Sequence, residues 1–502
     1  MQLVAYGAQD IYLTGNPQIT FFKLVYRRHT NFSMESIKQT FDGDANFGGN
    51  VTATISRNGD LVHRMYLEHS ATFTHIVSNN NNNINLVERY GDSLIKECEI
   101  EIGGQRIDRH TSMWNRVYSD LTEFNPSGHF AADQMIEVND IIGGNGTLSQ
   151  LMKGNGYGLN TGAYHTSADR FGMKTDITTI NGFTYFSQFG GADVSSIAVN
   201  KIFIPLNFWF NRNPGLALPL IALQYHEVKI KMTFEESSNL ARESLSTADT
   251  VSAFHWHATP ITSAAVTVSP ANFNLWCDYI YLDTDERRRF AQVSHEYLID
   301  QVQIQNTTIS QATEKIELNF NHPVKELIWT MRNETIGQSA HTGGRHQIPA
   351  VNLGDSSSGP TSIDEIGGTW KLKLNGHDRF KQRDTKYFSR TQVWQHHTGY
   401  GGVPSIGYIH EAAGNVPNSG EAVSSDSILV YSFALKPEEH QPSGTCNFSR
   451  IDNAELIGTE LKVAGVNVGD TTNATSVSLT IFAVNYNVLR IMSGMGGLAY
   501  SN

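Results

Sequence analysis

The chain has 502 residues with 49 acidic and 37 basic side chains, which gives a net charge of −12 at neutral pH. This length predicts two to four domains, or two large β domains. The acidic balance argues against direct nucleic-acid binding, which needs a basic footprint, and a charged share of only 17% excludes a coiled coil or a disordered polyelectrolyte.

The first ten residues have no basic start and no long apolar core, so we expect no signal peptide, and no glycine follows Met1 to accept a myristoyl group. The longest apolar runs, Phe203–Phe210 and Leu216–Leu223, are too short to span a membrane, and each contains a proline. The cysteines are odd in number and far apart, which favours reduced thiols and synthesis inside a cell: Cys98, Cys277 and Cys446.

Along the chain the dominant hydrophobic period is two, which is typical of antiparallel strands with one buried face. Clear alternation begins only near residue 51. One short amphipathic helix is predicted from Met113, Val117 and Leu121. Strands without intervening helices exclude Rossmann and TIM-barrel folds and favour sandwiches or jelly rolls. The alternating segments are Val51–Ile55, Cys98–Ile102, Ile230–Phe234, Val302–Ile304, Ile316–Phe320, Leu372–Leu374 and Val477–Ile481.

Three weak internal similarities keep their order along the chain and indicate a duplication. A charged run, Asp283–Arg289, lies between the two copies and predicts a solvated connector. Polar stretches over 140–200, 335–368 and 396–428 predict long surface or partner-binding loops. The similar pairs are Ile102–Asp108 with Leu374–Phe380, Phe208–Phe210 with Tyr431–Phe433, and Tyr279–Tyr281 with Tyr486.

Several long strings make the sequence resemble one family, the major capsid proteins of nucleocytoplasmic large DNA viruses, including those of algal viruses and mimivirus. The similarity covers most of the chain and departs from a compact member mainly in the long loops. The strings are Gly7–Lys23 with Tyr26–Phe32, Pro205–Phe210, Gly215–Lys229, Asp278–Asp283, Glu286–Phe290, His295–Leu298, His322–Trp329, Leu374–Phe380, Tyr431–Leu435, His440–Arg450, Asn485–Arg490 and Gly494–Tyr500.

The resemblance implies an all-β fold of two consecutive eight-stranded antiparallel jelly rolls with long loops and few short helices. We therefore expect an N-terminal arm (1–30), a first jelly roll (31–284), a connector (285–294) and a second jelly roll (295–502). The resemblance also implies a homotrimeric, pseudo-hexagonal capsomer that tiles an icosahedral shell over an internal membrane, beside neighbouring capsomers and minor capsid and penton proteins. Such a subunit is synthesised and assembled in the host cytoplasm, needs no cofactor and is no enzyme.

The arm is the main candidate for an assembly element, and we expect it on the inner side of the shell. Asn16 and Pro17 force an extended or turn backbone. Its aromatic side chains either anchor the arm to the barrel base or neighbouring components, or cap the chain's own barrel. Arg27 and Arg28, like Arg287–Arg289, either face inner proteins and anionic lipid headgroups or are solvated. The aromatic residues are Phe21, Phe22 and Tyr26.

Other polar clusters favour structural roles. Lys371–Lys386 holds six basic side chains, and the alternation of Leu372 and Leu374 favours a strand with a basic solvent face over a nucleic-acid site. Metal-binding motifs are absent from the sequence, so we expect no metal. Adjacent residues of a strand point to opposite faces, which argues against a shared ion at His396 and His397. The other histidine candidates are His255 with His257 and His410 with Glu411.

Seven Asn-x-Ser/Thr sequons occur, and Asn145 lies in the most loop-like context, so it is the candidate for glycosylation. The others are Asn31, Asn50, Asn306, Asn333, Asn447 and Asn473.

The alternative function is a multi-barrel lectin or polysaccharide-active enzyme, which the aromatic β pattern and polar loops also suit. Sugar binding by a small oligomer would favour that alternative; stable trimers and ordered arrays would favour a shell protein.

Overall fold

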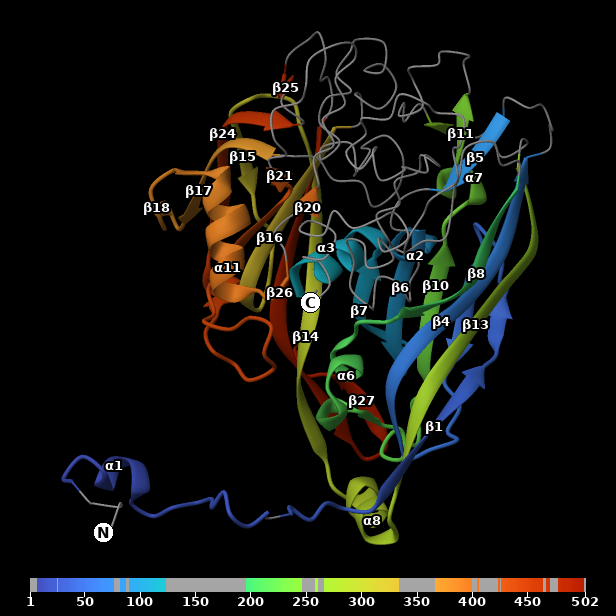
Figure 1. Cartoon of the computed structure of the whole chain (residues 1–502), viewed down its shortest axis with the longest axis vertical. Helices are drawn as coiled ribbons and strands as arrows, with labels where there is room; N and C mark the ends of the chain where they lie inside the picture. The colour runs from blue at the N-terminus through green and yellow to red at the C-terminus, as the bar shows by residue number, and fades with distance from the viewer. Residues whose placement is uncertain are drawn as a thin grey trace.

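The computed structural model describes residues 7–24, 26–75, 82–86, 90–122, 196–245, 258–260, 266–333, 366–399, 404–405, 423–424, 426–463, 466–469 and 477–500. Within these ranges the strands pair antiparallel and form two stacks of sheets side by side (Figure 1). The helices of the described part are short, and none combines the length and apolar character that a membrane span requires.

The first half of the chain folds into two sheets around one core. The order of the first sheet is β1 (Phe32–Gln39), β13 (Val266–Leu282), β4 (Leu61–His75) and β8 (Ser196–Pro205), with β9 (Leu218–Pro219) paired to β4. The order of the second is β2 (Phe41–Gly43), β3 (Asn50–Thr54), β10 (Val228–Phe234), β6 (Ile95–Ile102) and β7 (Gln105–Thr111). A small sheet of β12 (Ala258–Pro260), β11 (Ala241–Leu245) and β5 (Asn82–Leu86) accompanies them.

The second half repeats this arrangement. Its first sheet runs β14 (His295–Ile309), β26 (Val477–Met492), β16 (Pro323–Asn333) and β22 (Ile428–Ser432), with β23 (Cys446–Asn447) on β16 and β27 (Met495–Leu498) on β26. Its second sheet runs β15 (Glu314–Glu317), β24 (Ala454–Val463), β17 (Ile366–Leu374) and β18 (His377–Asp378), with β19 (Arg383–Asp384) and β25 (Val466–Asn467) attached. β20 (Pro404–Ser405) and β21 (Val423–Ser424) form a separate pair.

The two halves are therefore two jelly rolls with the same strand order, and the predicted duplication is confirmed. β1, β13, β4 and β8 correspond in order to β14, β26, β16 and β22. The similar strings around Gly103 and Asn375 form equivalent hairpin turns between β6 and β7 and between β17 and β18. Both turns have positive φ at both central residues, which Gly and Asn tolerate best: Gly103, Gly104, Asn375 and Gly376.

Strict alternation explains why these segments form half-buried strands. On β6, Cys98, Ile100 and Ile102 point into the first core, while the intervening glutamates face outward. One of these glutamates, Glu101, pairs across the sheet with Lys231 of β10 at 2.5 Å. Opposite charges on the wet face and apolar side chains on the dry face hold the strand in one register, since a one-residue slip would exchange the two faces.

The helices are α1 (Ile11–Thr14), α2 (Tyr90–Leu94), α3 (Ser112–Thr122), α6 (Trp209–Arg212), η3 (Pro214–Leu216), α7 (Ser237–Leu240), α8 (Thr284–Gln292), η5 (Tyr387–Thr391), α11 (Gln392–His396) and η6 (Phe448–Arg450). The predicted amphipathic helix is α3. The charged run between the repeats forms α8, which joins β13 to β14 at the base of the molecule (Figure 1). Asp283 caps α8 by accepting from the Thr284 amide, and Arg287 pairs with Asp60 at 2.9 Å.

One strand lacked the alternating pattern, and one argument from the sequence was wrong. β1 begins at Phe32, earlier than the alternation indicated, because its residues are mostly exposed at a sheet edge, where no core imposes a pattern. His396 and His397 do not lie on a strand. His396 ends α11, and His397 follows it in an extended conformation, so the argument from opposite strand faces does not apply to them.

Candidate functional site

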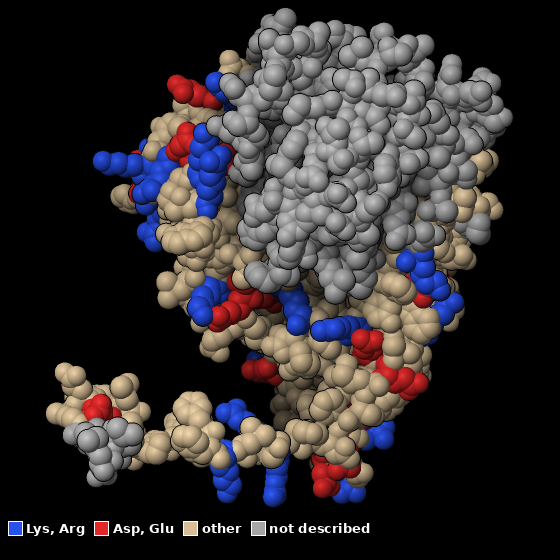
Figure 2. Space-filling model, viewed as in Figure 1, with Lys and Arg blue, Asp and Glu red and all other residues tan. Residues whose placement is uncertain are grey.

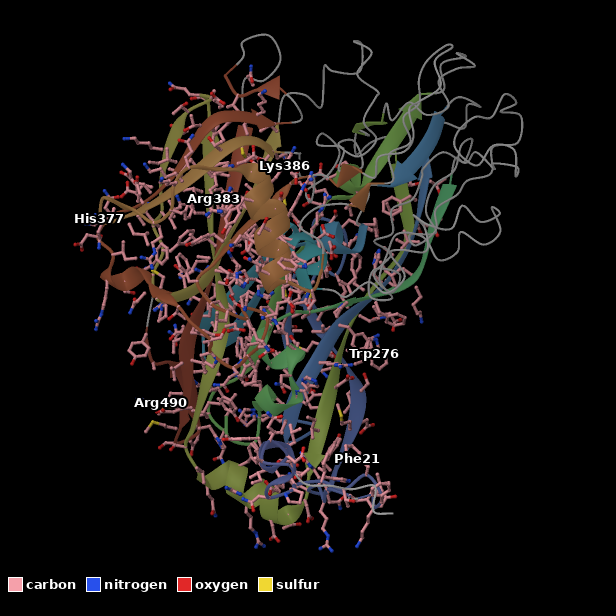
Figure 3. The ribbon with its side chains drawn as sticks, turned by 60° about the vertical axis from the view of Figure 1, so that its left-hand side comes forward. Phe21, Trp276, His377, Arg383, Lys386 and Arg490 are labelled. Carbon is pink, nitrogen blue, oxygen red and sulfur yellow. The ribbon has the colours of Figure 1, made fainter. Side chains whose placement is uncertain are left out.

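The N-terminal arm leaves the first jelly roll at its base and extends away from it (Figure 1). α1 forms one short turn, and Asn16 adopts a positive φ of 52° immediately before Pro17. The aromatic side chains of the arm are almost fully exposed: Phe21 by 89%, Phe22 by 98% and Tyr26 by 81%. Within the described part of this single chain, the arm therefore presents apolar area to solvent, and Phe21 lies at the base (Figure 3).

The arm is also basic. Arg27 and Arg28 are exposed, and no ion pair between described residues involves either guanidinium. Basic side chains of the arm project away from the barrels in Figure 2. Solvated guanidinium groups next to exposed aromatic rings combine the two side-chain types that are enriched at protein interfaces.

A second feature is the seam, which we define as the contact between α3 and the outward face of the sheet β14–β26–β16–β22. Trp114, Val117 and Leu121 of α3 are at most 2% exposed, and they pack on apolar side chains of the second jelly roll. The ring centroids of Trp114 and Phe482 lie 5.3 Å apart. Burial of three large side chains, each worth about 1.5–3 kcal/mol, holds the two barrels together. The partners are Val302, Ile328, Val430, Phe482 and Val484.

Charged groups continue the seam below this apolar cluster. Asp300 of β14 pairs with Lys325 of β16 at 3.1 Å and with Arg212 of α6, in the first barrel, at 3.3 Å. The Lys325 side chain is only 2% exposed, and its ammonium lies 5.1 Å from the ring centroid of Tyr486. Removal of one member of a buried pair leaves an uncompensated charge, so this network penalises any displacement of α6 from β14.

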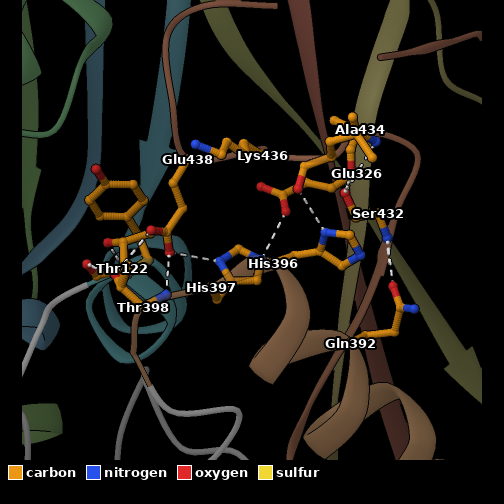
Figure 4. Close-up of polar contacts among 12 residues, drawn as sticks. Thr122, Glu326, Gln392, His396, His397, Thr398, Ser432, Ala434, Lys436 and Glu438 are labelled. Atoms are coloured by element: carbon orange, nitrogen blue, oxygen red, sulfur yellow. Dashed lines mark hydrogen bonds and ion pairs between the residues drawn. The ribbon is translucent and has the colours of Figure 1, made fainter. Parts of the chain in front are cut away.

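His397 lies between two carboxylates (Figure 4). Its Nε2 is 3.0 Å from Glu326 of β16, and its Nδ1 is 3.0 Å from Glu438. Burial opposes the charged ring, but Glu326 and Glu438 outweigh it and raise the pKa of His397 to about 9. His397 is therefore an imidazolium at neutral pH that is ion-paired with Glu326 through Nε2 and with Glu438 through Nδ1, so it is available neither as a base nor as a metal ligand.

Glu438 also connects the segment that follows α11 to α3. Glu438 accepts from the Thr398 amide at 3.0 Å and from its hydroxyl at 2.9 Å, and that hydroxyl lies 2.9 Å from the Thr122 carbonyl (Figure 4). A cavity of about 190 Å³ beside this cluster is lined by residues of both barrels, among them Trp114, Tyr118, Arg212 and Lys325. Its charged walls already neutralise one another, which favours a structural role over catalysis.

The cysteine residues that the sequence raised as candidates have structural roles. Cys98, Cys277 and Cys446 are free thiols, and burial raises the pKa of each, so they stay protonated and unreactive at neutral pH. The described residues contain no group of three or more His, Cys, Asp or Glu side chains that could hold a metal. His255, His257, His410 and Glu411 lie outside the described residues.

The basic stretch Lys371–Lys386 begins on a strand, as expected. Leu372 of β17 is buried, while Lys371 and Lys373 face outward and Lys371 pairs with Asp378 at 2.5 Å. Arg383 stacks over the Tyr387 ring at 4.1 Å. Figure 3 shows His377, Arg383 and Lys386 spread across one side of the second jelly roll, from its edge to the helix that ends at His396.

The sequons divide into two groups. Asn31, Asn50, Asn306 and Asn447 are exposed, although Asn447 accepts from the Ser449 amide at 3.1 Å. Asn333 ends β16, whereas Asn145 and Asn473 lie outside the described residues, so the structure does not test glycosylation at Asn145. The seam network, by contrast, is a feature that sequence reasoning missed. Its members are far apart in the chain, and only the buried Asp300, Lys325 and His397 side chains together define it.

Comparisons with known proteins agree with the two-barrel architecture. Residues 20–283 match the family described as major capsid protein N-terminus, and residues 286–413 and 414–497 match the large eukaryotic DNA virus major capsid protein family. The chain is 46% identical over 505 residues to the major capsid protein of Pyramimonas orientalis virus, covering 100% of this chain and 99% of that protein. It is 38% identical to the major capsid protein of Paramecium bursaria Chlorella virus 1, with the same coverage.

Solved structures show the same fold. A quasi-atomic model of the PBCV-1 virus capsid matches with a TM-score of 0.62 and 32% identity, covering 96% of this chain and 100% of that one. The Faustovirus major capsid protein has a TM-score of 0.61 at 14% identity, a likeness of fold alone, and covers 97% of this chain and 94% of its own. These relatives are structural proteins of the virion shell and not enzymes. The chain belongs to the major capsid proteins of large eukaryotic DNA viruses.

Proposed function

We propose that the chain self-assembles into a homotrimeric capsomer of pseudo-hexagonal outline, and that these capsomers tile the icosahedral shell of a large double-stranded DNA virus. The observation that supports this proposal is the presence, in one chain, of two jelly rolls with the same strand order. Three such chains around a three-fold axis present six similar barrels, so the outline approaches six-fold symmetry and similar edges can meet different neighbours.

We further propose the division into an arm (1–30), a first jelly roll (31–284), a connector (285–294) and a second jelly roll (295–502). The division is supported by the start of β1 at Phe32, the end of β13 at Leu282 and the start of β14 at His295. The arm then contacts minor capsid and penton proteins on the inner side of the shell, near the internal membrane. Exposed aromatic and basic side chains support this role: Asn16 and Pro17 shape the arm, and Phe21, Phe22, Tyr26, Arg27 and Arg28 make the contacts.

The test is the assembly state of the purified full chain. Light scattering should give a mass three times that of the 55.7-kDa chain, and negative-stain images should show compact particles with a hexagonal outline. A stable monomer that binds glycans in array experiments would instead favour the lectin or polysaccharide-active alternative.

Asn145 stays the predicted glycosylation site, and the masses of peptides from virion-derived protein would test it.

A further inference from the structure

Two arginines lie side by side along the edge of the sheet β15–β24–β17–β18. The register of β19 places Arg383 opposite Trp370 of β17. The Arg379 amide continues the ladder after β18 and donates to the Leu372 carbonyl at 2.8 Å. Residues that pair across adjacent strands share one face of a sheet. Because Trp370 and Leu372 point into the core, both arginines lie on the core-facing side of this edge.

The acidic residues nearest to the two arginines in the sequence have other partners. Asp378 pairs with the outward-facing Lys371, and the Asp384 carboxylate accepts from the Lys386 amide at 2.9 Å. Among the described residues, no hydrogen bond or ion pair involves either guanidinium. Neighbouring like charges repel each other, so an anion that contacts both guanidinium groups would remove an unfavourable interaction.

Aromatic rings form a firm support beneath this edge. The guanidinium carbon of Arg383 lies 4.1 Å from the ring centroid of Tyr387. Phe380 follows Arg379 and packs on Phe388 and on Tyr431 of β22, with centroid distances of 5.4 and 4.8 Å. A guanidinium that stacks on a ring is attracted to the ring face and is oriented before any ligand arrives.

The hydroxyl of Tyr431 is a third donor at the same place. The side chain is half-buried, and its hydroxyl makes no hydrogen bond to another described residue. Burial raises the pKa of Tyr431 above its ordinary value, although Arg379 and Arg383 act in the opposite direction. The phenol therefore keeps its proton at neutral pH and can donate a hydrogen bond, and both guanidinium groups are close enough to influence it.

We propose that Arg379, Arg383 and Tyr431 bind a tetrahedral phosphate group, either free phosphate or a phosphate monoester. Guanidinium groups are planar donors that match two phosphate oxygens at once, and the phenol supplies a neutral donor beside them. The site belongs to the second jelly roll alone, and Arg383 lies well apart from Phe21 of the arm (Figure 3). It therefore gives the chain a ligand in addition to its proposed role in a shell.

Calorimetric titration of the purified full chain with inorganic phosphate tests the site, at constant ionic strength because salt screens exposed charges. We expect a Kd of about 1 mM or tighter. The double variant Arg379→Gln/Arg383→Gln should raise the Kd at least about 10-fold, because it removes hydrogen bonds from charged donors. Tyr431→Phe keeps the ring and removes only the hydroxyl, so it should raise the Kd by about 3- to 10-fold.

The matched control is Arg288→Gln/Arg289→Gln, which removes the same charge from two exposed arginines of α8 and should leave the Kd unchanged. The Tm without phosphate should stay the same in every variant.

Glycerol 3-phosphate separates the two sources of the phosphate group. Binding as tight as that of inorganic phosphate would assign the site to a phosphate monoester, and weaker binding would assign it to free phosphate. An unchanged Kd in the double arginine variant, or no phosphate binding below about 10 mM, would overturn the inference. Either of these results would leave the proposed trimer intact, because the site lies within one barrel.

Discussion

Trp209 tests how much one aromatic side chain contributes to the first barrel. It lies in α6, is 1% exposed and meets the Phe210 ring edge-to-face at 5.2 Å. Trp209→Ala should reduce the free energy of unfolding by about 3–5 kcal/mol, because a cavity replaces the indole, and trimer yield should fall with it. Thermal denaturation and size-exclusion chromatography measure both effects. Tyr12→Ala, at a position that is 92% exposed, should change neither, and an unchanged Tm for Trp209→Ala would contradict the core placement.

His397 gives a prediction with a defined pH window. Its pKa in the folded chain is about 9, above its ordinary value of 6.5, so folding favours the charged ring. This stabilisation, at most about 3 kcal/mol, is fully present below pH 6.5 and is lost as the pH rises through about 9. Wild-type protein should therefore lose stability between pH 7 and pH 9.

The comparison for this prediction is His397→Gln, which keeps a donor between Glu326 and Glu438 but has no charge to lose. The variant should be less stable than wild type at pH 7, and the difference should shrink as the pH approaches 9, measured by urea unfolding at each pH. A constant difference across this range would show that the ring is not the titrating group.

Single residues also show what the sequence can and cannot reveal. Gly103 and Asn375 could be matched because short-range turn chemistry leaves a local signature. Tyr279 and Tyr486 do lie on corresponding strands, but Tyr279 is in the first core whereas Tyr486 contacts Lys325 at the seam. The two strands therefore share a residue type at these positions, but the two side chains have different surroundings. The ion pairs of Asp300 and His397 join segments far apart in the chain, and no local pattern encodes such contacts.

At the scale of elements, the arm can be separated from the barrel that follows it. Deletion of residues 1–25 removes α1 and the exposed aromatic residues Phe21 and Phe22 but leaves β1, which pairs with β13 from Phe32 onward. The truncated chain should form trimers with an unchanged Tm, yet fail to assemble into shells with the other virion proteins. Light scattering and electron microscopy would distinguish the two steps. Loss of soluble trimers would show that the arm belongs to the barrel.

The elements that the sequence predicted well are those with a core on one side. Alternation identified β6, β10, β17 and β26, and the i, i+4 spacing in residues 113–121 identified α3, because burial selects apolar residues at those positions. β1 was missed because it is a largely exposed edge strand. α8 was expected as a solvated connector, and its helical form follows from the Asp283 cap and good helix formers.

At the scale of the whole molecule, the seam should make the two barrels unfold together. The first core cluster includes Ile299, Leu489 and Ile491 of the second barrel, and α3 buries its apolar stripe on that barrel. Calorimetry of the dissociated chain should therefore show one cooperative transition. Trp114→Ala should lower its midpoint and broaden or split it, whereas Tyr12→Ala should not. Two independent transitions in the wild-type chain would contradict this coupling.

The place of β26 has a consequence for synthesis. This strand comes near the end of the chain, yet it lies between β14 and β16 at the centre of its sheet. During translation β14 and β16 emerge long before the strand that unites them, and β26 also supplies Leu489 and Ile491 to the first core. Until the last segment leaves the ribosome, nascent chains hold two unpaired strand edges in the crowded cell, so dependence on chaperones should last until synthesis of the chain ends.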